Sequence, residues 1–168
     1  LGIINKLRED NKRLKEQMQE QQKNLQKYAK EYYLMGNECI THMHDTRAAL
    51  ANYDKAIELY PDYADAWVRK GVTLFNADRI NEAEACLDKA VRLRPMEFKT
   101  VYNRGKLRLH TGDTEGAIAD LDKATTLKPQ HAGAHECFGD ALTQAGKEME
   151  AAIQYRLAEE LRKRKSNQ

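Results

Sequence analysis

The stretch that decides the fold runs from residue 66 to residue 71 and reads Ala66-Trp67-Val68-Arg69-Lys70-Gly71. Residues of three kinds in and around this stretch return after thirty-four positions, and again after another thirty-four. They are Pro61, Pro95 and Pro129, then Gly71, Gly105 and Gly139, then Ala56, Ala90, Ala124 and Ala158. Self-similarity at one fixed period of this length indicates an array of helical repeats, each built from one supersecondary unit.

The residue types within one period explain how such a repeat would fold. Small residues such as Gly71 and Ala83 fit where two helices cross closely, and large ones such as Trp67 and Leu87 fill the gaps beside them. Proline lacks an amide hydrogen and disfavours a helical residue before it, so Pro95 ends the second helix of its pair. A single helix pair cannot bury its apolar side, and neighbouring repeats must therefore stack to make a core.

The pattern resembles the tetratricopeptide repeat, which the chain matches over residues 30–163. We expect four copies, at 30–61, 62–95, 96–129 and 130–168, the last with an extended helix. One extra residue between Gly36 and Ala49 should distort the first turn, and Lys163 stands where the other copies have proline. The resemblance implies an all-α, right-handed superhelix of antiparallel helix pairs. It also implies a concave side, lined by the first helices, that binds peptides or protein segments, and no enzymatic activity.

Residues 1–29, here called the leader, carry a heptad pattern that continues into the first repeat. Its positions step by three and four and are Ile4, Leu7, Asn11, Leu14, Met18, Gln21, Leu25, Tyr28 and Tyr32. The residues between them are mostly good helix formers, and the segment holds no proline. We therefore expect a coiled-coil helix of about 40 Å. It should run without a break into the first helix of the first repeat.

A long helix with one narrow apolar stripe must bury this stripe, and a second copy of the same helix is the simplest partner. The seam expected to form this homodimer consists of Ile4, Leu7, Asn11, Leu14, Met18 and Leu25. Asn11 favours a parallel pair, in which two facing amides can hydrogen-bond. The alternatives left open are packing on the chain's own repeats, contact with another protein, and an amphipathic helix on a membrane.

A second set of residues falls on the inner side of the array, where the resemblance puts the peptide groove. These residues are Lys30, Tyr33, Asn37, Arg69, Lys99, Tyr102, Asn103 and Lys106. The first helices of repeats two and three carry six lysines and arginines against one acid, Asp65, whereas their second helices are rich in Asp and Glu. We thus expect a basic concave side, an acidic convex side, and an acidic peptide or protein segment as the partner.

Two other interpretations of these residues remain open. The charges could form an ordinary solvated helix face without a ligand. The resemblance also extends to members that clamp the acidic C-terminal tails of heat-shock chaperones with Lys, Asn, Asn, Lys and Arg. The matching slots here hold Tyr33, Asn37, Arg69, Lys99 and Asn103, of which Asn37 and Lys99 agree. A monomeric co-chaperone-like adaptor and an assembly element of a larger complex are therefore the runner-up functions.

The sequence shows no arrangement typical of an enzyme, and we expect no cofactor and no metal. His131 and His135 lie four residues apart near Cys137, but His135 fills the slot that Trp67 has in repeat two, so packing explains it. No phosphate-binding loop and no nucleophile–base set is present. The basic run at residues 162–165 lacks interleaved aromatic residues, which disfavours nucleic acid as a partner.

Composition adds to this interpretation. Lysine and arginine number 28 against 26 aspartates and glutamates, with the excess at the two ends of the chain. No run of eighteen apolar residues occurs, so no membrane span is expected. Three widely spaced cysteines indicate reduced thiols and a cytoplasmic protein, with the nucleus as a second compartment. The absence of an initial Met suggests a fragment of a longer chain. The sequence predicts a non-catalytic, dimeric scaffold or adaptor.

Overall fold

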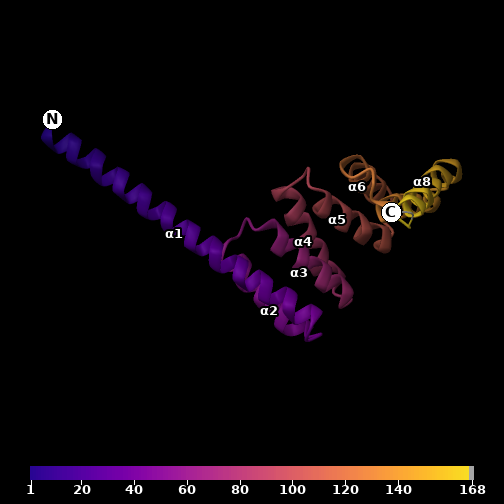
Figure 1. The fold of residues 1–168 in the computed structure, drawn as a ribbon, viewed down its shortest axis with the longest axis horizontal. Coiled ribbons are helices and arrows are strands. Elements are labelled where there is room, and N and C mark those ends of the chain that lie inside the picture. Colours follow the sequence, from indigo (N-terminus) through magenta and orange to yellow (C-terminus); the bar gives the residue numbers. More distant parts are fainter. Residues whose placement is uncertain (167–168) are drawn as a thin grey trace. The chain divides into compact units, whose positions relative to one another are not determined.

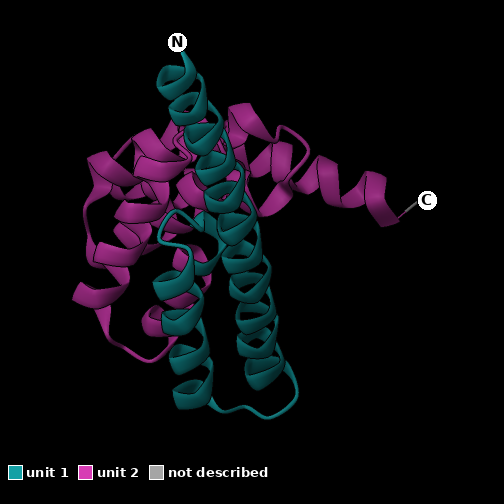
Figure 2. Ribbon diagram, turned by 90° about the vertical axis from the view of Figure 1, so that its left-hand side faces the viewer, with its two compact units in different colours: residues 1–66 teal, residues 67–168 magenta. Residues whose placement is uncertain are grey.

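The computed structural model describes residues 1–166, and these residues form eight α-helices and no strand. The helices are α1 (Gly2–Thr41), α2 (Thr46–Leu59), α3 (Ala64–Asn76), α4 (Ile80–Leu93), α5 (Phe98–Thr111), α6 (Thr114–Leu127), α7 (Ala132–Gln144) and α8 (Glu148–Ser166) (Figure 1). By their contacts they group into two compact units, residues 1–66 and residues 67–168 (Figure 2). The predicted all-α fold with a long N-terminal helix is confirmed.

Unit 1 contains α1 and α2, two antiparallel helices of very different length (Figure 2). α1 continues for 40 residues, so the leader and the first helix of repeat one are a single helix, as predicted. At 1.5 Å per residue this helix is about 60 Å long. The C-terminal part of α1 packs on α2 through Ala29 and Ala56, which have no exposed surface. Such small side chains let the two helices approach closely, and tyrosines close around the contact.

The turn between α1 and α2 holds four residues, 42–45, whereas the equivalent turns of the other three helix pairs hold two or three. His44 takes a left-handed backbone conformation with φ of 52°, as do Asp78, Gly112 and Gly146 at successive intervals of thirty-four residues, so this conformation is common to all four repeat turns. Asp45 follows and caps α2, because its side chain accepts a hydrogen bond from the amide of Ala48 at 2.9 Å. The inserted residue is thus absorbed before the second helix begins.

Unit 2 contains α3 from Trp67 onward and the helices α4 to α8, which form the pairs α3–α4, α5–α6 and α7–α8 within the predicted repeats two, three and four. α4 ends at Leu93 and α6 at Leu127, each two residues before a proline. Lys163 takes the place of that proline in the last repeat, and α8 continues to Ser166. The turn inside repeat three uses Gly112 at φ 83°, and Asp113 then accepts a hydrogen bond from the amide of Gly116 at 3.0 Å.

The repeating glycines mark where the first and second helices of a pair cross. A Cβ atom added at Gly105 would lie 2.9 Å from Cγ of Leu121, and one added at Gly71 would lie 2.8 Å from Cγ of Leu87. Only a hydrogen atom fits at these distances, so glycine sets how closely the helices pack. Around the crossings lie fully buried residues of several helices, such as Val101, Leu121 and Leu142. This frame positions the outward side chains of α5, α7 and α8.

Candidate protein-interaction face

Four of the predicted groove residues lie together on α5, and we call Lys99, Tyr102, Asn103 and Lys106 the α5 face. Their spacing of three and four residues places them on one side of the helix. Lys99 and Lys106 are exposed, whereas Tyr102 and Asn103 are half-buried. The Asn103 amide donates to the backbone carbonyl of Lys99 at 2.8 Å, so it is held against its own helix. The two lysines therefore present the charge of this face to solvent.

An aromatic cluster supports the α5 face. The ring of Tyr102 stacks on Phe98 at 5.0 Å between centroids, and His131 lies 4.7 Å from Phe98 and 5.2 Å from Tyr102. Lysines lie over two of these rings: the Lys106 amine is 5.5 Å from the centroid of Tyr102, and the Lys128 amine is 4.9 Å from that of Phe98. Cation–π contacts at exposed sites contribute about 0.5–1 kcal/mol each, enough to bias the lysine rotamers.

α7 borders the α5 face through Cys137, whose sulfur lies 3.8 Å from the Tyr102 hydroxyl. Burial raises the pKa of Tyr102 and also raises the pKa of the Cys137 thiol, because the charged forms lose hydration there. Both groups consequently stay neutral near pH 7. Cys137 has none of the thiolate character that a nucleophile needs.

The acids of α7 are engaged by groups of α8. Glu136 forms an ion pair with Arg162 through both carboxylate oxygens. Asp140 accepts a hydrogen bond from the Tyr155 hydroxyl at 2.8 Å. The ion pair offsets the negative charge of Glu136, whereas Asp140 keeps its charge because the Tyr155 hydroxyl is neutral.

The expected separation of a basic concave side from an acidic convex side is wrong for the two arginines of α5. Arg104 binds both carboxylate oxygens of Asp120 at 2.8 Å and also reaches Asp88 at 3.1 Å. Arg108 donates to Asp120 at 3.0 Å and lies 3.4 Å from Asp113. Asp120 is buried, and its hydrogen bonds raise the pKa of Arg104 still further above its usual value. These arginines hold α4, α5 and α6 together and offer little charge to a ligand.

Arg69 lies on α3 and is exposed. It occupies the position that Asn103 and Cys137 take in the next two repeats, thirty-four and sixty-eight residues later. α3 lies against α5 through Phe75, whose ring meets the edge of His110 at 5.0 Å. By repeat equivalence Arg69 belongs to the same side of unit 2 as the α5 face.

The three remaining predicted groove residues belong to unit 1, and two of them take part in packing there. The ring of Tyr33 lies 5.2 Å from Tyr63 and 6.2 Å from Tyr53. The side-chain oxygen of Asn37 accepts a hydrogen bond from the Tyr53 hydroxyl at 2.9 Å. Lys30 is exposed on α1. Tyr33 and Asn37 thus contribute to the stability of repeat one.

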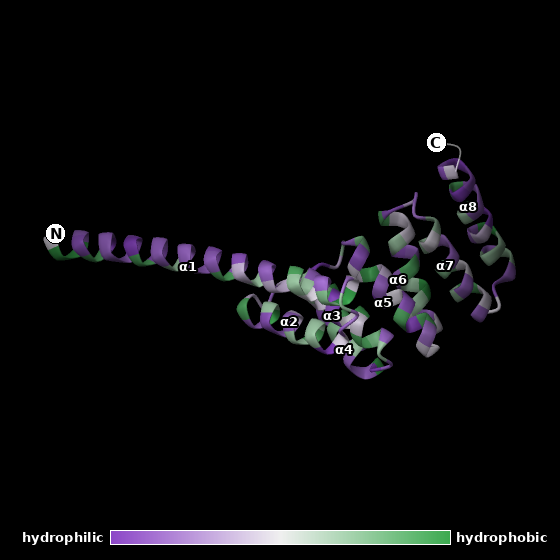
Figure 3. Cartoon of the chain, turned by 60° about the horizontal axis from the view of Figure 1, so that its bottom comes forward, coloured by the Kyte–Doolittle hydropathy of each residue, from purple (hydrophilic) through white to green (hydrophobic). Residues whose placement is uncertain are grey.

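The leader presents its predicted seam to solvent. Every residue of the predicted seam is exposed, including Leu7 at 56 % and Leu14 at 55 % of its surface. Figure 3 shows a largely hydrophilic ribbon along this part of α1, with short hydrophobic segments that recur along it. A helix whose large apolar residues are exposed at heptad spacing is suited to pair with another helix.

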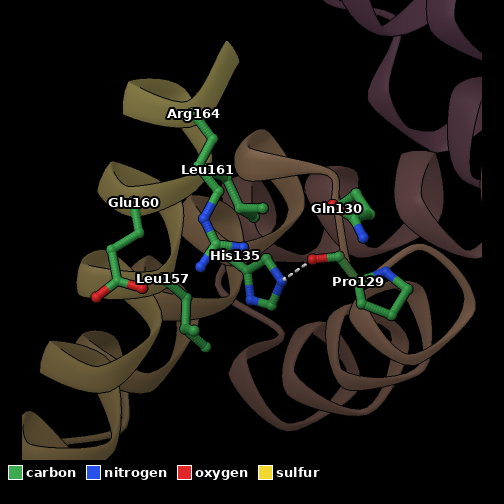
Figure 4. A pocket seen from close by; sticks show the side chains of 7 residues that line it. All are labelled: Pro129, Gln130, His135, Leu157, Glu160, Leu161 and Arg164. Carbon is green, nitrogen blue, oxygen red and sulfur yellow. Dashed lines mark hydrogen bonds between the residues drawn. The ribbon is translucent and has the colours of Figure 1, made fainter. Parts of the chain in front are cut away.

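The histidines of α7 have structural roles. The Nδ1 atom of His131 accepts a hydrogen bond from the amide of Ala134 at 3.1 Å, which caps the helix. His135 is buried, with Nε2 at 2.9 Å from the Pro129 carbonyl (Figure 4) and Nδ1 at 2.8 Å from Gln154. In residues 1–166 no cluster of His, Cys, Asp and Glu could hold a metal ion. In the same residues no helix is long and apolar enough to cross a membrane.

Sequence reasoning missed the aromatic support of the α5 face. Phe98, His131 and Lys128 come from three different segments, and their proximity depends on how α5 meets the turn before α7. The only available signal was that an aromatic residue precedes Lys99 and that a histidine opens the next repeat.

Family models of the tetratricopeptide repeat match residues 42–102, 73–132 and 102–167. The chain belongs to the tetratricopeptide repeat family. Proteins with tetratricopeptide repeats bind other proteins, which makes this chain a protein-interaction scaffold in the broad sense.

Other proteins resemble the chain over part or most of its length. The uncharacterized protein MJ0572 of Methanocaldococcus jannaschii is 35 % identical over 77 residues, which are 46 % of this chain and 88 % of that protein. The crystal structure of MamA superimposes with a TM-score of 0.75 at 21 % identity, over 83 % of this chain and 81 % of MamA. MamA from Desulfovibrio magneticus RS-1 gives a TM-score of 0.71 at 24 % identity, over 80 % and 76 % of the two chains. At this identity, the likeness to MamA shows a shared tetratricopeptide repeat fold.

Proposed function

We propose that this protein is a dimeric scaffold that binds an acidic segment of another protein along the α5 face. The observation that supports the proposal best is the pair of exposed lysines, Lys99 and Lys106, on either side of the half-buried ring of Tyr102. Exposed positive charge attracts carboxylates over a distance, and the aromatic ring offers apolar contact once they arrive. Arg69 extends the positive charge to α3.

The spacing of the lysines defines the motif that fits. Seven residues separate Lys99 from Lys106, which is about 10 Å along a helix axis. A peptide in the extended polyproline II conformation advances about 3.1 Å per residue and has three residues per turn, so two carboxylates three residues apart lie on one side and match this distance. An apolar side chain between them would lie over Tyr102. The favoured ligand is therefore an extended segment of the form Glu-Leu-Ala-Glu.

Dimerisation through the leader is the second part of the proposal. The seam residues are exposed, and Asp10 lies where it can attract Lys15 of a parallel second copy. Two copies would present two α5 faces on one particle, and a partner with several acidic segments would be held more tightly by both than by one. The three cysteines, far apart in the sequence, fit a protein of the reducing cytoplasm.

The test uses fluorescence anisotropy with a labelled peptide that carries the Glu-Leu-Ala-Glu core. The probe should bind the full chain, and the double variant Lys99→Glu with Lys106→Glu should lose at least tenfold in affinity. The matched control is Lys89→Glu with Lys123→Glu, which makes the same charge change on α4 and α6. Binding should also weaken as salt is added, because exposed charges are screened.

If both double variants lose affinity for the peptide equally, the loss follows from the net charge of the protein, and a site on α5 is contradicted. Retained affinity in Lys99→Glu with Lys106→Glu would move the acidic-segment site elsewhere. A peptide with glutamine in place of both glutamates serves as the second control and should bind much more weakly.

A further inference from the structure

α8 carries four large apolar residues at a constant spacing of four, and three of them are strongly exposed. We call Met149, Ile153, Leu157 and Leu161 the α8 ridge. Met149 is 85 % exposed, Ile153 is 59 % and Leu157 is 38 % exposed, whereas Leu161 is half-buried. Residues four apart form one continuous ridge on a helix surface, and such ridges are the rows that interdigitate when two helices pack.

The ridge is specific to the last repeat. The three exposed positions correspond to Glu115, Ala119 and Lys123 in α6, and to Asn81, Ala85 and Lys89 in α4. Repeats two and three thus place polar or small residues where the fourth repeat places methionine, isoleucine and leucine. The frame of the repeat does not need apolar residues there, so they require another explanation.

The ridge does not face the helix that α8 packs on. α8 meets α7 through Ala151 and Ala158, each 1 % exposed, and the ridge lies on another side of the helix. At its C-terminal end the ridge borders a pocket that Leu157 and Leu161 line from one side and Pro129 from the other, with His135 between them (Figure 4). The pocket is also lined by Gln130, Glu160 and Arg164, so the apolar ridge ends at a surface of mixed polar and apolar character.

Charge along α8 is polarised from end to end. The first turn carries Glu148 and Glu150, and the last turn carries Lys163, Arg164 and Lys165. An antiparallel second copy of α8 would place the acidic start of each helix near the basic end of the other. A parallel copy would place acid against acid and base against base. Antiparallel alignment also sets the helix dipoles in opposite directions, which is the favourable arrangement.

We propose that the α8 ridge is an interface that pairs with the α8 ridge of a second copy of this chain, with the two helices antiparallel. Twofold symmetry brings Ile153 of one copy near Leu157 of the other, and Met149 near Leu161, so every ridge residue meets an apolar partner. The contact is small, since each copy contributes one helix face, and it is therefore weaker than a full-size interface. It is independent of the leader seam and would join different pairs of chains.

The first experiment isolates this contact in the full chain. All samples carry Leu7→Glu and Leu14→Glu, which put charges into the leader seam and leave α8 as the interface under test. In this background, sedimentation equilibrium should show a monomer–dimer equilibrium as the concentration rises through the micromolar range. Adding Met149→Glu, Ile153→Ala and Leu157→Lys should leave a monomer, with apparent molar mass halved at the highest concentration.

These three substitutions install the residues that α6 carries at the equivalent positions, so the helix should keep its fold. Circular dichroism checks that helicity is unchanged. Ala152→Lys, an exposed change on another side of α8, is the matched control and should leave the dimer intact. A monomeric background chain at every concentration would overturn the proposal, as would a triple variant that dimerises as well as the background.

A charge exchange tests the orientation. Glu150→Arg should weaken the dimer, because the new arginine then lies near the basic end of the second copy, and Arg164→Glu added to it should restore the affinity. The contact of Glu150 with Lys147 at 4.0 Å is an exposed pair and contributes little to the balance. If the double exchange fails to restore dimerisation, the antiparallel orientation is wrong.

Discussion

Replacing Leu14 by alanine tests the leader dimer most quantitatively. Leu14 keeps 55 % of its surface exposed in the single chain. Burying a whole leucine side chain contributes about 1.5–3 kcal/mol, so covering the remaining half contributes about 1 kcal/mol in each copy. Loss of both contributions weakens the dimer by about 2 kcal/mol, which is about thirtyfold in the dissociation constant. Alanine is the best helix former, so α1 itself should be unaffected.

Sedimentation equilibrium of the full chain at several concentrations measures this effect directly. The control is Gln19→Ala, an exposed change beside the seam, which should leave the dissociation constant within about twofold of the original value. To isolate the leader, every sample carries the α8 substitutions Met149→Glu, Ile153→Ala and Leu157→Lys. Equal dissociation constants for Leu14→Ala and Gln19→Ala would refute the assignment of Leu14 to a buried seam. A chain that stays monomeric throughout would refute the leader dimer itself.

Two further predictions concern stability. Gly105→Ala should lower the free energy of unfolding by about 1 kcal/mol, because the cost of overpacking against Leu121 exceeds the gain in helix propensity. A thermal unfolding temperature that is unchanged or higher in this variant would contradict the close crossing of α5 and α6. Asp120→Ala should cost about 3 kcal/mol, since Arg104 and Arg108 lose their buried partner, whereas Asp122→Ala on the exposed side of α6 should have little effect in the same denaturant titration.

The helix pairs could be predicted because the signals are local and repeat. Pro95 and Pro129 each end the second helix of their repeat. Gly71 and Gly105 each indicate a close crossing of the two helices in their repeat. The continuity of α1 also followed from local properties, namely good helix formers without a break and a heptad step that enters the first repeat. The longer turn between α1 and α2 could also be located, by counting one residue more between Gly36 and Ala49 than between the equivalent residues of the other repeats.

The charges of the candidate face were harder to predict. Arg104 and Asp120 are sixteen residues apart on different helices, and only the packing of α5 on α6 decides that they pair. Counting both as surface charges therefore overstated the basic character of α5. Asn37 is predicted to line the groove, but its side-chain oxygen accepts a hydrogen bond from the hydroxyl of Tyr53, sixteen residues later. Composition along one helix cannot show which of its charges a neighbouring helix neutralises.

The α8 ridge illustrates a different limit. Met149, Ile153 and Leu157 are visible in the sequence, and their departure from the other repeats can be counted there. The sequence does not show whether these side chains are exposed, and by residue type alone they would be expected in the core of a terminal helix. The structure shows that α8 uses alanines to meet α7 and leaves the larger residues outside.

The central claim is that the α5 face receives an acidic segment, and chemical-shift mapping of the full chain with the Glu-Leu-Ala-Glu peptide tests it most directly. The account predicts that the amide signals that move most are those of residues 99–106 on α5, together with their neighbours at 131–137. Changes that cluster instead on α4 and α6, or along the leader, would contradict it.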